Sequence, residues 1–107
     1  MQEYKKLIRD RIPEIIENNG DKAEVRELND EEYKKELLKK LVEEAKEVVE
    51  AGEDKKELTK EIGDVQEIIN YLIQIFDLDK DEIEKVRQER KKSRGGFDKK
   101  LFLEYTE

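Results

Sequence analysis

The chain of 107 residues contains no cysteine, no histidine and no tryptophan, and it has a single proline. Without cysteine no disulfide can form, and without cysteine or histidine the softer ligands that zinc and copper prefer are missing. No signal-type apolar segment and no run of eighteen apolar residues occurs, so we expect neither export nor a membrane span. These absences predict a cytoplasmic protein in which any metal ion is held by oxygen ligands.

Charge is abundant. Half of the residues are charged, 35% are hydrophobic, and the net charge is −7. A negative chain of this kind is not expected to bind nucleic acid in general. The apolar residues fall in periodic clusters and charges of both signs are interspersed, which favours a folded protein over a disordered one. The length suits one domain, which we expect to span residues 1–107.

The periodicity of the apolar residues predicts an all-α fold. Asn29, Asp54 and Asp79 are each followed three residues later by a glutamate, an arrangement typical of helix N-termini. Gly20 and Gly52 stand where helices would end. We therefore predict helices at about 13–18, 30–51, 55–77 and 80–92, with a loop or brief extended piece at 23–28.

Only the second and third predicted helices are long and strongly amphipathic. Their apolar stripes consist of Leu37, Leu38, Leu41, Val42, Ala45, Val48 and Val49, and of Leu58, Ile62, Val65, Ile69, Leu72, Ile73 and Phe76. Two helices alone bury such stripes poorly, so we predict a homodimer or higher homo-oligomer that completes a four-helix bundle. The fourth helix is basic and weakly anchored, and the apolar tail at 100–105 is expected to dock onto another surface.

Two pairs of acids stand out on the long helices: Glu44 with Glu47, and Glu61 with Asp64. Each pair is spaced i, i+3, so its members lie on one side of a helix. Spacing alone is a weak signal because glutamate occupies 21 of the 107 positions. If both segments are helices packed side by side, all four carboxylates can point into a common space, and an oxygen-rich site of this kind suits magnesium, calcium or manganese.

The position of these acids on their helices is more informative than their spacing. Glu44 lies three residues after Leu41 and four before Val48, at the margin of an apolar stripe. Glu61 lies three after Leu58 and four before Val65, in a core-type position.

A carboxylate in such a place must be protonated, paired with a cation or bound to metal. The alternative to a metal site is a salt-bridged helix seam that uses Lys40 or Lys60. Glu43 and Glu57 lie on more exposed arcs and are expected to be solvated.

The chain resembles the MazG-like, all-α nucleoside triphosphate pyrophosphohydrolases, a superfamily that includes phosphoribosyl-ATP pyrophosphohydrolase and dimeric dUTPases. Its signature of Glu-Glu-x-x-Glu followed by Glu-x-x-Asp is matched by residues 43–47 and 61–64. The segment Tyr-Lys-Lys-Leu-Ile-Arg-Asp-Arg-Ile-Pro at 4–13 and Arg-Gly-Gly-Phe at 94–97 resemble a subgroup of small single-domain members that remove non-standard nucleotides. The resemblance covers nearly the whole chain.

This resemblance implies a reaction in which a nucleoside triphosphate is hydrolysed between its α and β phosphates, giving a nucleoside monophosphate and pyrophosphate. It implies magnesium, with manganese as a substitute, on Glu44, Glu47, Glu61 and Asp64. Either Glu44 or Glu47 would activate the attacking water. The substrate phosphates need cationic partners, for which the candidates are Lys6, Arg9, Lys91 and Arg94. A basic helix end also complements the helix dipole, so this part of the prediction has a structural alternative.

Some members of the superfamily have an asparagine seven residues after the last acid, where this chain has Tyr71. Tyr71 would stack on a base or pack at the oligomer seam. Two other functions remain open: a non-catalytic helical oligomer that binds a protein partner, and a nucleotide-binding module that has lost catalysis.

Overall fold

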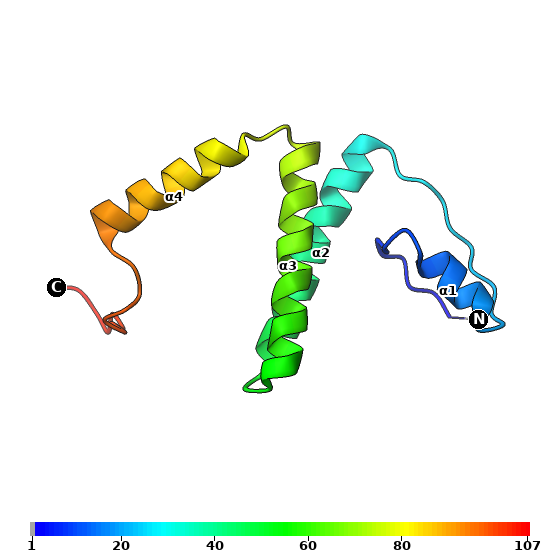
Figure 1. The fold of residues 1–107 in the computed structure, drawn as a ribbon, viewed down its shortest axis with the longest axis horizontal. Coiled ribbons are helices and arrows are strands. Elements are labelled where there is room, and N and C mark those ends of the chain that lie inside the picture. The colour runs from blue at the N-terminus through cyan, green and yellow to red at the C-terminus, as the bar shows by residue number, and fades with distance from the viewer. Residues whose placement is uncertain (1) are drawn as a thin grey trace. The chain divides into compact units, whose positions relative to one another are not determined.

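The computed structural model describes residues 2–107 and contains four helices and no strand within that range (Figure 1). The helices are α1 (Ile12–Asn18), α2 (Asp30–Ala51), α3 (Lys55–Ile75) and α4 (Lys80–Arg94). The predicted all-α fold is therefore confirmed. Each predicted helix is present with its ends within about two residues of the expected positions, the usual uncertainty of helix boundaries.

The polar residues predicted to begin helices do so. The side chain of Asn29 accepts a hydrogen bond of 2.9 Å from the backbone N–H of Glu32, whose side chain in turn accepts one from the Asn29 backbone N–H. Asp54 and Asp79 cap α3 and α4 by accepting bonds from backbone N–H groups of the first turn. These caps satisfy donors that have no partner inside a helix, and they fix where α2, α3 and α4 begin.

Helices α2 and α3 pack against each other as an antiparallel hairpin (Figure 1). Gly52 ends α2 with a φ of 59°, a left-handed conformation that costs glycine little, and Asp54 already caps α3. Because the turn is so short, each residue near the end of α2 lies opposite one near the start of α3. The hairpin thereby sets the acidic motif of α2 beside that of α3.

The hairpin has a thin apolar core. Leu37, with 2% of its surface exposed, is the one fully buried apolar side chain in the described part of the chain. Several members of the predicted stripes are instead exposed, namely Leu38, Val42 and Val49 on α2, Ile62 and Ile69 on α3, and Phe76 at the C-cap of α3. Two helices share only one face with each other, so a stripe wider than that face leaves apolar side chains on the surface.

The chain divides into two compact units, residues up to Asp77 and residues 78–107. The second unit contains α4 and the C-terminal segment, and it buries no residue of its own. Its apolar side chains, including Phe97, Leu101, Phe102 and Tyr105, are largely exposed. The docking predicted for the tail at 100–105 stays a prediction. No helix within residues 2–107 is both long enough and apolar enough to cross a membrane.

Candidate metal centre

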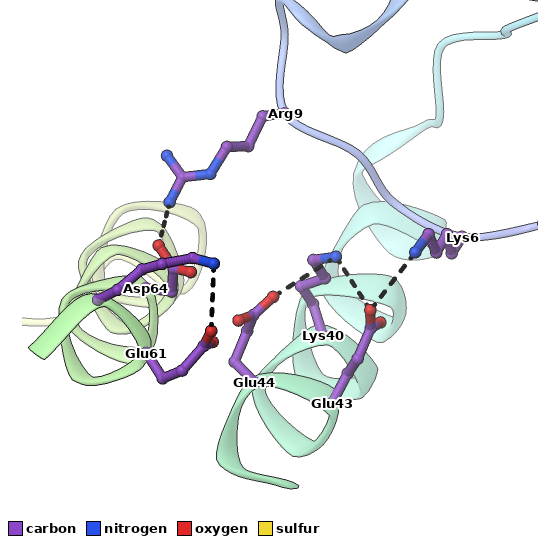
Figure 2. A network of polar contacts seen from close by, with 8 residues as sticks. Lys6, Arg9, Lys40, Glu43, Glu44, Glu61 and Asp64 are labelled. Atoms are coloured by element: carbon purple, nitrogen blue, oxygen red, sulfur yellow. Dashed lines mark hydrogen bonds and ion pairs between the residues drawn. The ribbon is translucent and has the colours of Figure 1, made fainter. Parts of the chain in front are cut away.

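Two glutamates are buried at the seam between α2 and α3. Glu44 and Glu61 retain 8% and 6% of their surface exposed, and they point toward each other from the two helices (Figure 2). The sequence predicted a core-type position for Glu61, and the structure confirms it. Glu44 was expected only at the margin of its stripe and is nearly as buried, because α3 covers it.

Further carboxylates converge on this pair. One oxygen each from Glu44, Glu61 and Asp64 lie within 4.8 Å of one another, and the same holds for Glu43, Glu44 and Glu47. The two groups share Glu44, so one acidic cluster contains all four predicted metal ligands. Glu43 belongs to it as well. The sequence placed Glu43 on an exposed arc, but it is half-buried beside Glu44.

The buried oxygens of the cluster fit a hard cation. Oε2 of Glu44 and Oε2 of Glu61 are buried and accept no hydrogen bond within residues 2–107. Buried polar atoms in folded proteins are nearly always paired, because an unpaired one has lost its hydration without compensation. A divalent cation such as Mg²⁺ would satisfy these oxygens, since it takes several carboxylate oxygens at once.

Two lysines meet the outer oxygens of the same glutamates. Nζ of Lys40 lies 3.3 Å from Oε1 of Glu43 and 3.6 Å from Oε1 of Glu44. Nζ of Lys60 lies 3.7 Å from Oε1 of Glu61. The lysines expected in the alternative, a salt-bridged seam, are therefore present. Each contacts only one edge of the cluster, and the inner oxygens stay unpaired.

The crowding of carboxylates changes how they titrate. The carboxyl of Glu47 is the main cause of a raised pKa at Glu61, followed by burial, while Lys60 opposes the shift. The interaction with Glu61 lowers the pKa of Glu47, but the carboxyl of Glu44 and burial outweigh it, so the pKa of Glu47 is also raised. Glu47 and Glu61 thus bind protons more readily than free carboxylates do, as expected when like charges share a site.

The segment before α1, residues 2–11, reaches both halves of the cluster (Figure 2). Arg9 donates a hydrogen bond of 3.0 Å from Nη2 to Oδ1 of Asp64, and its Nη1 lies 3.6 Å from Glu67. Nζ of Lys6 lies 3.6 Å from Oε1 of Glu43. Two of the four predicted phosphate-binding residues therefore lie at the cluster. Lys91 and Arg94 belong to α4 in the other unit, so their role stays a prediction.

Tyr71 lines a small groove of about 150 Å³ together with Tyr33, Gln74 and Ile75. Burial is the main cause of a raised pKa at Tyr33, and Tyr71 and Asp10 add to it. The sequence singled out Tyr71 but not Tyr33. The two tyrosines are brought together only by the pairing of α2 with α3, which no local pattern reveals.

Comparisons with known proteins add no relative to this picture: no protein-family model matches the chain, and neither the curated proteins nor the solved structures that were searched contain a match.

Proposed function

We propose that the chain is a magnesium-dependent nucleoside triphosphate pyrophosphohydrolase of the MazG-like type, which hydrolyses its substrate between the α and β phosphates. The observation that carries this proposal is the pair of buried, unpaired carboxylate oxygens on Glu44 and Glu61, in a cluster that also includes Glu47 and Asp64. A surface salt-bridge network would not bury such oxygens without partners. A cytoplasmic location and a preference for non-standard nucleotides belong to the same proposal.

Glu44, Glu47, Glu61 and Asp64 are the proposed ligands of magnesium, or of manganese in its place. When bound, the ion would neutralise charge on the phosphate oxygens and make a coordinated water more acidic. Glu47 is the better of the two predicted candidates for accepting a proton from the attacking water. Glu44 is held by Lys40, whereas Glu47 makes no ion pair with any lysine or arginine among residues 2–107.

Positive side chains are the expected partners of the substrate phosphates. Lys6 and Arg9 lie at the cluster and are the first candidates, and Lys91 and Arg94 remain further ones. Tyr33 and Tyr71 offer aromatic faces beside a groove, which suits contact with a nucleobase.

A second copy of the chain is the proposed cover for the exposed apolar side chains of α2 and α3. A chain of this size whose only fully buried apolar side chain is Leu37, among the residues described, needs more apolar burial for a stable fold. Pairing two hairpins into a four-helix bundle supplies it. Light scattering at micromolar concentration should therefore give at least twice the monomer mass of 12.8 kDa. A monomeric mass would refute this part of the proposal.

A panel of nucleoside triphosphates, including non-standard ones, tests the activity. With magnesium present, at least one substrate should release pyrophosphate rather than phosphate. Glu61→Gln keeps the size of the side chain and removes the charge, so it should abolish the release. Glu84→Gln is the matched control, because Glu84 lies on the exposed face of α4. A fully active Glu61→Gln protein would refute the assignment of that ligand.

The rival function is a non-catalytic helical oligomer that binds a protein partner, and the ion pairs of Lys40 and Lys60 favour it. In that case the acids serve only the seam between the helices, and millimolar magnesium should leave the melting temperature unchanged. A nucleotide-binding module without catalysis would be stabilised by magnesium and would bind nucleotide without turnover.

A further inference from the structure

The N-terminal segment, residues 2–11, forms a strap that spans the two halves of the acidic cluster. Its Lys6 contacts Glu43 on α2, and its Arg9 contacts Asp64 on α3 (Figure 2). These are contacts between parts of the chain far apart in sequence, 55 residues apart for Arg9 and Asp64. Both contacts place a positive side chain of the strap on an acid of the cluster, next to the unpaired oxygens of Glu44 and Glu61.

The acid that Arg9 holds is one that a divalent cation would need. Oδ1 of Asp64 accepts the hydrogen bond from Arg9, and an Asp64 oxygen is also among the three that lie within 4.8 Å of one another. A carboxylate bound to a dication is a poorer partner for a guanidinium, since both cations draw on the same negative charge and repel each other. Cation binding and the Arg9–Asp64 pair therefore oppose each other.

Arg9 is well placed to change partners. More than half of its side chain is exposed (57%), compared with 14% for Lys40, which lies within the seam. A guanidinium presents a planar set of N–H donors that matches two oxygens of a phosphate group. Once released from Asp64, the Arg9 guanidinium would have its donors free for an anion.

We propose that Arg9, assisted by Lys6, couples cation binding to polyanion binding: a divalent cation at the cluster displaces Arg9 from Asp64, and the freed side chain binds the pyrophosphate-type group of the ligand. This inference rests on the proposed function, because it uses the same cluster. It adds that cation and polyanion bind cooperatively through the strap, and that Arg9 opposes the first ligand while it favours the second.

The test is isothermal titration calorimetry on the full chain, first with magnesium alone and then with inorganic pyrophosphate at saturating magnesium. Arg9→Ala should bind magnesium about two- to fivefold more tightly, the range expected for loss of an exposed competing ion pair. The same variant should bind pyrophosphate about tenfold more weakly or worse, because it lacks a charge-assisted donor. Effects of opposite sign on the two ligands are the signature of an exchange of partners.

Arg11→Ala is the matched control. Arg11 lies two residues further along the strap and pairs with Glu14, 3.2 Å away, rather than with the cluster. The substitution makes the same change in net charge, so it should leave both affinities within twofold of the wild type. If Arg11→Ala changes both affinities as Arg9→Ala does, the effect comes from the loss of one positive charge anywhere in the strap, and the proposal is overturned.

Arg9→Lys keeps the positive charge and serves if the alanine variant loses its helical circular dichroism. It should bind magnesium as the wild type does and pyrophosphate several-fold more weakly, because an ammonium lacks the planar fork. Weaker binding of both ligands in the Arg9 variants would mean that Arg9 only holds Asp64 in position, and the exchange would be overturned. If magnesium does not bind the wild type at all, the proposed function itself fails along with the exchange. Normal magnesium binding and turnover in Arg9→Ala, with unchanged pyrophosphate affinity, would overturn the exchange alone.

Discussion

Acidic side chains occur in two contrasting settings in this protein. On α4, Glu84 pairs with Arg87 one turn further along and also accepts a hydrogen bond from Gln88, and these contacts lower the pKa of its carboxyl to about 2. At the α2–α3 seam, Glu61 faces other carboxylates and its pKa is raised. Both glutamates lie in helices. The comparison teaches that the neighbours, and not the residue type or the helix, decide whether an acid is a surface charge or a candidate ligand.

The largest expected effect on stability comes from the difference in packing between the α2–α3 seam and α4. Leu37→Ala removes the one fully buried apolar side chain of the described residues and should lower the free energy of unfolding by about 2 to 5 kcal/mol. Ile83→Ala on α4 is the matched change, and it should cost clearly less because 42% of Ile83 is exposed. Urea unfolding followed by circular dichroism measures both. Equal losses would show that α4 is packed as tightly as the seam.

Magnesium should affect the seam and not α4. At a concentration of about a hundred times its dissociation constant, a ligand that binds only the folded state adds about 2.7 kcal/mol. For a chain of this length that corresponds to a rise in melting temperature on the order of 10 °C. Glu61→Gln should lose this rise, whereas Glu84→Gln should retain it. Scanning calorimetry with and without magnesium measures the melting temperatures. A rise in melting temperature that persists in Glu61→Gln would mean that the ion binds elsewhere.

The helix caps give a smaller and more local comparison. Asn29→Ala removes a capping box from α2 and should cost about 1 kcal/mol of global stability, since α2 forms half of the seam. Asp79→Ala removes the corresponding cap from α4, where it should chiefly increase hydrogen exchange in the first turn of that helix. Hydrogen exchange by NMR distinguishes the two outcomes. Global destabilisation by Asp79→Ala would show that α4 and the hairpin unfold together.

The contribution of the acids to folding stability should change with pH in opposite directions at the α2–α3 seam and on α4. Because the pKa values of Glu61 and Glu47 are raised, the stability that their protonation contributes is complete below the ordinary glutamate value of about 4.3. It is lost as the pH rises through the raised values. Glu84 has a lowered pKa, so its contribution is present above that ordinary value and is lost as the pH falls toward 2.

Urea unfolding with a chelator between about pH 4.5 and pH 8 should therefore show a modest fall in stability with rising pH. Glu61→Gln should flatten the curve, and Glu84→Gln should leave its slope unchanged. Stability that rises over this range in the wild type would contradict the raised pKa values of Glu47 and Glu61.

Much of the secondary structure could be predicted because its causes are local. The caps at Asn29, Asp54 and Asp79 use side chains within three residues of the N–H groups they bind. The end of α3 shows the limit of such signals. It was expected near 77 but falls at Ile75, where Phe76 is the C-cap and Asp77 adopts a left-handed conformation with a φ of 52°.

The candidate site was predictable only in part. Glu44 and Glu61 could be singled out because a carboxylate inside an apolar stripe is visible in the sequence. The half-burial of Glu43 and the pairing of Arg9 with Asp64 could not, because both depend on parts of the chain that lie far apart in sequence. The stripes also do not reveal which of their apolar side chains the partner helix covers, because this too depends on how segments far apart in sequence pack together. Val42 and Ile62 remain exposed although they lie within the predicted stripes.

The short turn at Gly52 also has a kinetic consequence. It makes the pairing of α2 with α3 a local event, and proteins dominated by local contacts fold quickly because little loop entropy is lost before contacts form. The acids of the two helices are therefore forced together early, while the chain is still gaining its apolar contacts. Folding of this hairpin brings the acids of its own cluster together against their repulsion. If the proposed site binds a divalent cation, that cation should accelerate folding as well as stabilise the folded protein.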